Sequence, residues 1–173
     1  CPKKEDELYK SMIDAKEQGL INHVGITTHK ITIAHEALNC GLYETIQYPF
    51  SYLSTNEEIK LVEKCKQLDV GFIAMKAMAG GLINNSKASY AYINQFDNVL
   101  PIWGIHTMKE LDEFLSYTQN TTLSNDLKQT IEKDKKELGD NFCRGCGYCM
   151  PCPQDINISL CARMSLWIRR FPT

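Results

Sequence analysis

The amino-acid sequence predicts an α/β protein with a parallel sheet, either doubly wound or part of a (β/α)8 barrel, followed by a small cysteine-rich helical segment. Three observations predict this fold. Segments with apolar residues at helical spacing alternate with short apolar runs up to about residue 120. The apolar runs are nearly continuous, which is typical of parallel strands covered on both faces. Four cysteines then crowd into residues 143–152.

The alternation supplies four βα units. The predicted helices and strands of these units are, in chain order, 8–19, 21–26, 31–41, 43–50, 56–69, 70–75, 86–96, 99–105 and 107–118. Gly19 and Gly41 are expected to end the first two helices, because glycine readily adopts the left-handed conformation found there. A capping pattern from Thr55 to Glu58 opens the third.

The pattern changes after Asn120. A charged helix is expected over 123–138, then the cysteine segment, then a closing helix over 158–171. We therefore divide the chain into barrel-like βα units over residues 1–120 and a helical domain over 121–173. The second domain is expected to bind a metal cluster through its cysteines, as described below.

Composition excludes several classes of function. A formal net charge of -2 and a pI near 6.1 give no basic field that would attract nucleic acid or an anionic membrane. The longest apolar runs fall far short of the ~20 residues of a membrane-spanning helix. The chain begins at Cys1 with no signal-peptide pattern, so we expect a domain or a processed chain in the reducing cytoplasm.

The cysteine segment predicts a metal centre. Cys143, Cys146, Cys149 and Cys152 recur every third residue, so a tightly turning backbone can direct four thiolates to one [4Fe-4S] cluster. Glycines between the first three cysteines permit unusual backbone angles and leave amides free for the sulfurs. Cys161 is the alternative fourth ligand. Zinc is the main competing metal, and two disulfides within ten residues would be strained.

Several phrases of the sequence carry a family resemblance: AKEQGLINHVGITTH, YETIQYPFSYL, VGFIAMKAMAGG, LPIWGIHTMKELDEF and CGYCMPCP. Together they resemble the second half of an aldo-keto reductase, from the bacterial subgroup with an iron-sulfur tail. The resemblance implies the C-terminal half of a (β/α)8 TIM barrel, about four βα units, followed by a small helical iron-sulfur domain.

The resemblance also implies a nicotinamide cofactor, NADP(H) or NAD(H), across the carboxyl ends of the strands. Threonines stand in place of a Ser-Asn pair, a glutamine matches the one that holds the carboxamide, and a methionine replaces the ring that stacks on the nicotinamide. The loop that follows the pyrophosphate runs from the next lysine to a glycine pair. The implied cofactor-binding residues are Thr27, Thr28, Gln47, Met75, Lys76, Gly80 and Gly81. The usual basic pair for a 2′-phosphate is missing near Gly104 and Lys109.

The resemblance assigns no catalytic residue to this chain. The Asp, Tyr, Lys and His of the family come from the first four strands, so we expect the full-length protein to reduce carbonyls with NAD(P)H and this chain alone to be inactive. His29 and His106 lie at strand ends and could face substrate. The alternative is a non-catalytic electron-transfer or cluster-stabilised scaffold. Four strands leave open edges, so we expect a partner: the missing N-terminal half, a second copy or another sheet.

Overall fold

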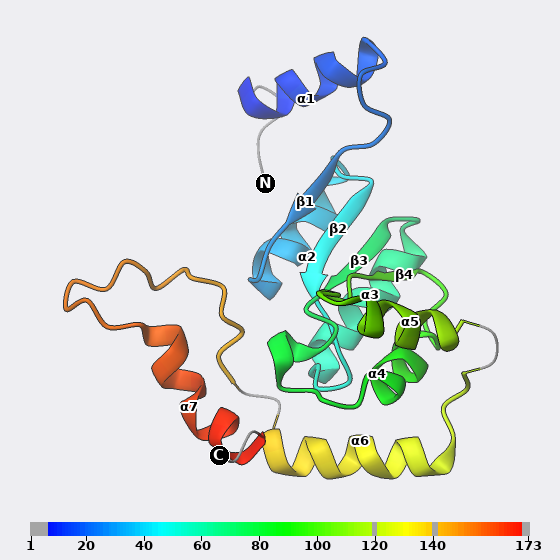
Figure 1. Cartoon of the computed structure of the whole chain (residues 1–173). Helices are drawn as coiled ribbons and strands as arrows, with labels where there is room; N and C mark the ends of the chain where they lie inside the picture. The colour runs from blue at the N-terminus through cyan, green and yellow to red at the C-terminus, as the bar shows by residue number, and fades with distance from the viewer. Residues whose placement is uncertain (1–6, 119–120, 140–141, 171–173) are drawn as a thin grey trace.

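The computed structural model describes residues 7–118, 121–139 and 142–170. Helices and strands alternate over residues 7–116, and two longer helices follow (Figure 1). The elements are α1 (Glu7–Glu17), β1 (Gly25–Thr27), α2 (Ile31–Cys40), β2 (Thr45–Pro49), α3 (Asn56–Gln67), β3 (Gly71–Met75), the 3-10 turn η1 (Ala79–Gly81), α4 (Ser86–Ile93), β4 (Val99–Pro101), α5 (Met108–Ser116), α6 (Asn125–Leu138) and α7 (Ile158–Arg170).

The four strands form one parallel sheet in the order β1-β2-β3-β4. Gly25 pairs with Thr45, Thr45 with Gly71, and Phe72 with Val99. This confirms the predicted parallel α/β sheet. A doubly wound sheet reverses its strand order at a switch point, whereas strands in unbroken sequential order are typical of part of a (β/α)8 barrel.

The main core lies on one face of the sheet. Ile46, Tyr48, Phe72 and Ala74 alternate toward α2 and α3 and are almost completely buried. The opposite face carries side chains such as Gln47 and Ile73, which are half buried, and Leu100, which is 65% exposed. The expectation that both faces are covered is therefore wrong for the described residues, since the strands place every second side chain on a face that their own helices do not cover.

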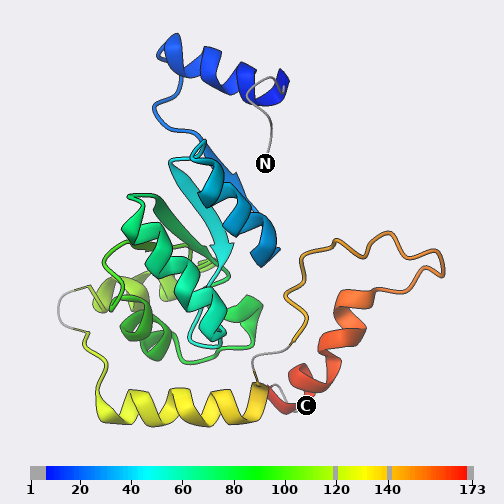
Figure 2. The same ribbon diagram turned by 180° about the vertical axis from the view of Figure 1, so that it is seen from behind.

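A second core forms around α6, which runs past the end of the sheet (Figure 2). Ile131 and Leu138 of α6 pack with Tyr52, Leu53 and Leu82 from the loops after β2 and β3. The buried Tyr52 hydroxyl donates a hydrogen bond to Asp134 of α6. The charged helix predicted over 123–138 is thus attached to the carboxyl-terminal side of the barrel units.

Helix boundaries match the sequence patterns within a few residues. The capping pattern at Thr55 is confirmed: its hydroxyl accepts from the Glu58 amide, and the Glu58 carboxylate accepts from the Thr55 amide. Thr107 and Glu110 form a second capping box at α5. The last strand is shorter than predicted and ends at Pro101. Among the described residues, no helix has the length and apolar character needed to cross a membrane.

Candidate functional site at the carboxyl ends of the strands

The carboxyl ends of β1 and β2 bring together some of the residues predicted to hold a nicotinamide. The Thr28 amide donates to the Gln47 carbonyl over 3.1 Å, and the Gln47 side-chain amide lies 3.8 Å from the Met75 sulfur. Thr28 is buried, and its hydroxyl accepts from the Lys30 amide. Thr27 instead lines a separate hollow beside α1. Gln47 and Met75 are therefore neighbours, whereas Thr27 faces elsewhere.

A cavity of about 630 Å³ lies at the carboxyl ends of β3 and β4. Lys76, Gly80 and Gly81, which were predicted to follow a pyrophosphate, all line it. Gly80 and Gly81 have positive φ angles of 63° and 88°, which permit a tight turn of the backbone. The opposite wall comes from Trp103 to His106 and from α5. Three of the seven predicted cofactor residues thus share one cavity.

The α5 wall of this cavity is acidic. Backbone hydrogen bonds from His106 and Thr107 lower the pKa of Glu110, and side-chain hydrogen bonds from Ser86 and Tyr117 lower the pKa of Glu113. Both carboxylates are consequently ionised at neutral pH. Lys76 is the one cation among the lining residues. The cavity suits ligand groups that donate hydrogen bonds to carboxylates, such as ribose hydroxyls.

The cysteine segment lies against the same strand ends. The Lys76 ammonium donates to the carbonyl oxygens of Arg144 and Gly145, the latter over 3.1 Å. The Arg144 guanidinium pairs with Glu58 of α3 at 3.0 Å, and both side chains are largely buried. The Tyr148 hydroxyl accepts from the amide of His29 over 3.2 Å. Contacts from the ends of β1 and β3 and from α3 therefore hold the segment.

Helix α7 adds a fourth contact through Arg163. Its Nη2 donates to the carbonyl oxygens of Ala79 and Gly80, over 3.1 and 2.8 Å. A Cβ atom added to Gly80 would lie 3.2 Å from this guanidinium, and one added to Gly145 would lie 3.6 Å from it. The guanidinium therefore lies between a loop glycine of the barrel units and a glycine of the cysteine segment.

The four predicted metal ligands have suitable chemistry but are not gathered in this conformation. Cys143, Cys146, Cys149 and Cys152 are all free thiols, as is Cys161. The Gly145 amide donates to the Cys143 sulfur over 3.4 Å, the kind of hydrogen bond that iron-sulfur sites use. In the described part of the chain, however, no three Cys, His, Asp or Glu side chains lie close enough to hold a metal ion. Four thiols are the right kind and number of ligands for a [4Fe-4S] cluster, but their sulfur atoms are not gathered around one point in this structure.

His29 contacts the cysteine segment through Tyr148. Its ring meets the Tyr148 ring edge-on at 5.7 Å, and its Nε2 is buried without a hydrogen-bond partner in the structure. Burial, followed by the charges of Lys76 and Arg144, lowers its pKa. A neutral imidazole can donate or accept one hydrogen bond at that nitrogen. His106, by contrast, lines the acidic cavity.

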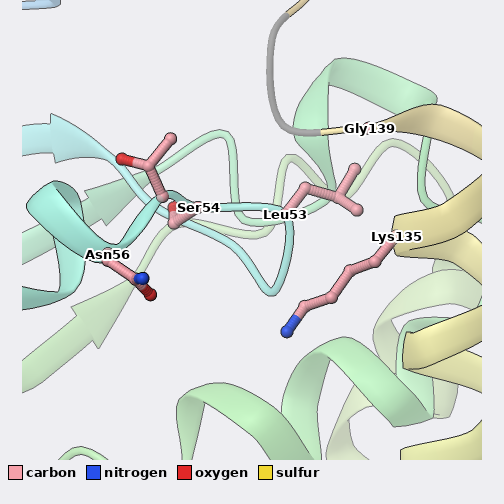
Figure 3. Close-up of a pocket in the computed structure, with 6 residues that line it drawn as sticks. Leu53, Ser54, Asn56, Lys135 and Gly139 are labelled. Atoms are coloured by element: carbon pink, nitrogen blue, oxygen red, sulfur yellow. The ribbon is translucent and has the colours of Figure 1, made fainter.

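A further pocket of about 380 Å³ lies between the loop after β2 and α6 (Figure 3). The Lys135 side chain extends into this space from α6, across from Leu53 (Figure 3). Ser54 and Thr55 line it as well, but their hydroxyls already take part in turn and capping hydrogen bonds. None of the predicted site residues lies here.

Sequence reasoning missed the residues that hold the cysteine segment: Glu58, Arg144, Tyr148 and Arg163. Glu58 was recognised only as a capping residue. For three of them, the position in the sequence could have indicated this role. Arg144 and Tyr148 lie inside the cysteine segment, and Arg163 lies two residues after Cys161. Their partners are 83 or more residues away in sequence and leave no periodic pattern.

A sequential parallel sheet with a cavity at its carboxyl end defines a barrel-type α/β protein. The model of the aldo/keto reductase family matches residues 2–138, and the chain belongs to this family. No curated protein matches the chain.

Solved structures agree in fold at low sequence identity. The aldo-keto reductase AKR11C1 from Bacillus halodurans, in its holo form, superposes with a TM-score of 0.61 at 15% identity, covering 77% of this chain and 58% of that one. A putative 2,5-diketo-D-gluconic acid reductase B gives 0.57 at 15% identity, with 76% and 53% covered. The aldose reductase of Schistosoma japonicum gives 0.54 at 17% identity, with 78% and 48% covered. The chain therefore spans about half the length of these reductases.

Proposed function

We propose that this chain is part of an NAD(P)H-linked carbonyl reductase in which residues 143–152 bind a [4Fe-4S] cluster. One observation carries the proposal: the cysteine segment is attached to the carboxyl ends of the strands by Lys76 and Arg144. Barrel enzymes carry their active sites at this end. The match to the aldo/keto reductase family supports the reaction class.

The residues at the strand ends support binding of a dinucleotide. The Gln47 amide can both donate to and accept from a carboxamide, and the neighbouring Met75 sulfur offers a polarisable surface beside it. Gly80 and Gly81 allow close backbone approach at the mouth of the cavity. The cofactor, when bound, supplies the hydride for the carbonyl. The chain's own residues would bind and orient it.

The proposed cluster ligands are Cys143, Cys146, Cys149 and Cys152, with Cys161 as the alternative fourth ligand. The support is the set of free thiols, the amide hydrogen bond to Cys143 and the absence of bulky side chains at Gly145 and Gly147. A bound cluster would exchange single electrons. Because a hydride carries two, the cluster is proposed to be structural or to serve a separate electron-transfer partner.

An electron-transfer module is the second candidate function. Apolar side chains next to the cysteines are exposed, with Tyr148 at 55%, Met150 at 42% and Ile156 at 48%. Exposed apolar residues around a redox centre are suited to transient docking of another protein. This function requires the cluster but no carbonyl reduction.

One set of measurements separates the two functions. The full-length protein is purified anaerobically, its iron and acid-labile sulfide are measured, and NADH and NADPH oxidation is followed with a panel of aldehydes. The test includes the Cys146→Ser and Cys149→Ser variants. We expect iron, sulfide and aldehyde-dependent oxidation in the wild type. Iron and sulfide without any oxidation would favour the electron-transfer module, and the absence of both elements would refute the cluster.

A further inference from the structure

Two cations converge on the cysteine segment from different parts of the chain. Lys76 follows β3 and donates to the Gly145 carbonyl over 3.1 Å, while Arg163 comes from α7. A Cβ atom on Gly145 would lie 3.8 Å from the Lys76 nitrogen and 3.6 Å from Arg163 Nη1. Gly145 separates Cys143 from Cys146 in sequence. Both positive charges therefore lie beside the backbone that links these two thiols.

These cations are held in place by hydrogen bonds to carbonyl groups. Lys76 binds two carbonyl oxygens of the cysteine segment, and Arg163 binds two in the loop after β3. None of the hydrogen bonds or salt bridges found in the described residues joins either of them to a carboxylate. Their charge is therefore not cancelled by a bonded anion and acts on nearby groups.

We propose that Lys76 and Arg163 form a positively charged pair beside the cysteine segment and raise the reduction potential of the cluster bound there. The inference rests on the proposed function, because it requires that cluster. Four thiolates and the iron-sulfur core carry net negative charge, and reduction adds one more electron. Adjacent positive charge stabilises the reduced form more than the oxidised form. Lys76 and Arg163 are positioning residues in this scheme, not ligands.

The test is a reduction titration of the full-length protein. Sodium dithionite supplies the electrons, and electron paramagnetic resonance follows the reduced cluster. The charge-removing variants are Lys76→Met and Arg163→Met, the charge-conserving variant is Lys76→Arg, and the control is Lys66→Met, which changes an exposed lysine paired with Asp97. Iron and sulfide content are measured for each protein.

We expect each charge-removing variant to lower the reduction potential of the cluster. At a fixed potential the ratio of oxidised to reduced cluster should rise about three- to tenfold, which corresponds to a lowering of about 30 to 60 mV at 59 mV per tenfold change for one electron. Lys76→Arg and Lys66→Met should titrate like the wild type. Loss of iron from Lys76→Met alone, with Lys76→Arg fully loaded, would also support a role for the positive charge at position 76 beside the cluster.

Two results would overturn the inference: fully loaded Lys76→Met and Arg163→Met proteins with wild-type potentials, or equal loss of iron from Lys76→Met and Lys76→Arg. These results leave the cluster itself intact in the wild type, so they are distinguishable from failure of the proposed function. A wild-type protein without iron or sulfide would remove the basis for both.

Discussion

The guanidinium of Arg144 lies 3.0 Å from the carboxylate of Glu58, and this ion pair joins the cysteine segment to the first turn of α3. The same carboxylate caps α3 through the Thr55 amide at 2.8 Å and accepts from the Tyr48 hydroxyl at 3.4 Å. Burial, followed by the charge of Glu58, raises the pKa of Tyr48 well above its usual value, so the phenol stays protonated and donates. One buried carboxylate therefore connects a strand, a helix and the cysteine segment.

Replacement of Arg144 by methionine should destabilise the protein. It removes the charged partner of Glu58, which is 8% exposed, but leaves the Thr55 and Tyr48 hydrogen bonds in place. We expect a loss of about 1 to 3 kcal/mol in the free energy of unfolding, measured by urea titration in anaerobic buffer. Lys66→Met is the matched control, because its pair with Asp97 is exposed and should contribute under about 1 kcal/mol. Equal losses in the two variants would contradict the role of the buried pair.

Much of the fold could be predicted because it follows from local patterns. The apolar stripe and capping box of α3 and the apolar run of β3 each depend on residues close in sequence. The wrong expectation that both faces of the sheet are covered has a physical cause. A run such as Val99–Pro101 has the same sequence whether its second face meets a helix, another strand or solvent.

The candidate site was less accessible to sequence reasoning. Gln47, Met75 and the glycine pair were assigned by resemblance. Gln47 lies within β2, Met75 ends β3 and the glycine pair lies in η1, and their role in binding a nicotinamide stays a prediction. The contact between Lys76 and the Gly145 carbonyl joins residues 69 apart. No periodicity or spacing reports such a contact, so Lys76 was assigned to a phosphate while the structure gives it carbonyl partners in the cysteine segment.

Acid should weaken the contact between α1 and the sheet. Hydrogen bonds from Lys16, then from His23, lower the pKa of Glu44 from 4.5 to about 2. A carboxylate with a depressed pKa in the folded state stabilises that state above pH 4.5, and the stabilisation is lost as the pH falls toward 2. The difference in unfolding free energy between the wild type and Glu44→Gln should therefore be larger above pH 4.5 than below it. The comparison variant is Glu63→Gln, an exposed change on α3 away from this contact; a flat difference for Glu44→Gln would refute the expectation.

The acidic wall of the cavity should disfavour a 2′-phosphate. Glu110 and Glu113 are ionised there, and a phosphate dianion placed beside them would be repelled, whereas a ribose hydroxyl could donate to them. We expect the protein to bind NADH about tenfold more tightly than NADPH, measured by fluorescence titration at low salt.

The variants Glu110→Gln and Glu113→Gln should narrow this preference. Glutamine at position 110 can still cap α5, so the helix should be retained. Glu63→Gln again serves as the control, because it lies on α3 outside the cavity. Tighter binding of NADPH by the wild type, or an unchanged ratio in both cavity variants, would show that the wall does not select the cofactor.

The buried hydrogen bond between Tyr52 and Asp134 should stabilise the attachment of α6. Tyr52 is completely buried and Asp134 is 4% exposed, so water cannot easily replace the hydroxyl. Tyr52→Phe keeps the ring that packs against Tyr92 but removes a donor to a buried carboxylate. We expect a loss of about 1 to 3 kcal/mol on urea unfolding, together with faster proteolysis within α6. Tyr9→Phe provides the comparison, because its hydroxyl donates to the Leu42 carbonyl over 3.3 Å from a partly exposed position, and water can take over that hydrogen bond. If the two phenylalanine variants unfold at the same urea concentration, the contact with Asp134 contributes no more than a surface hydrogen bond.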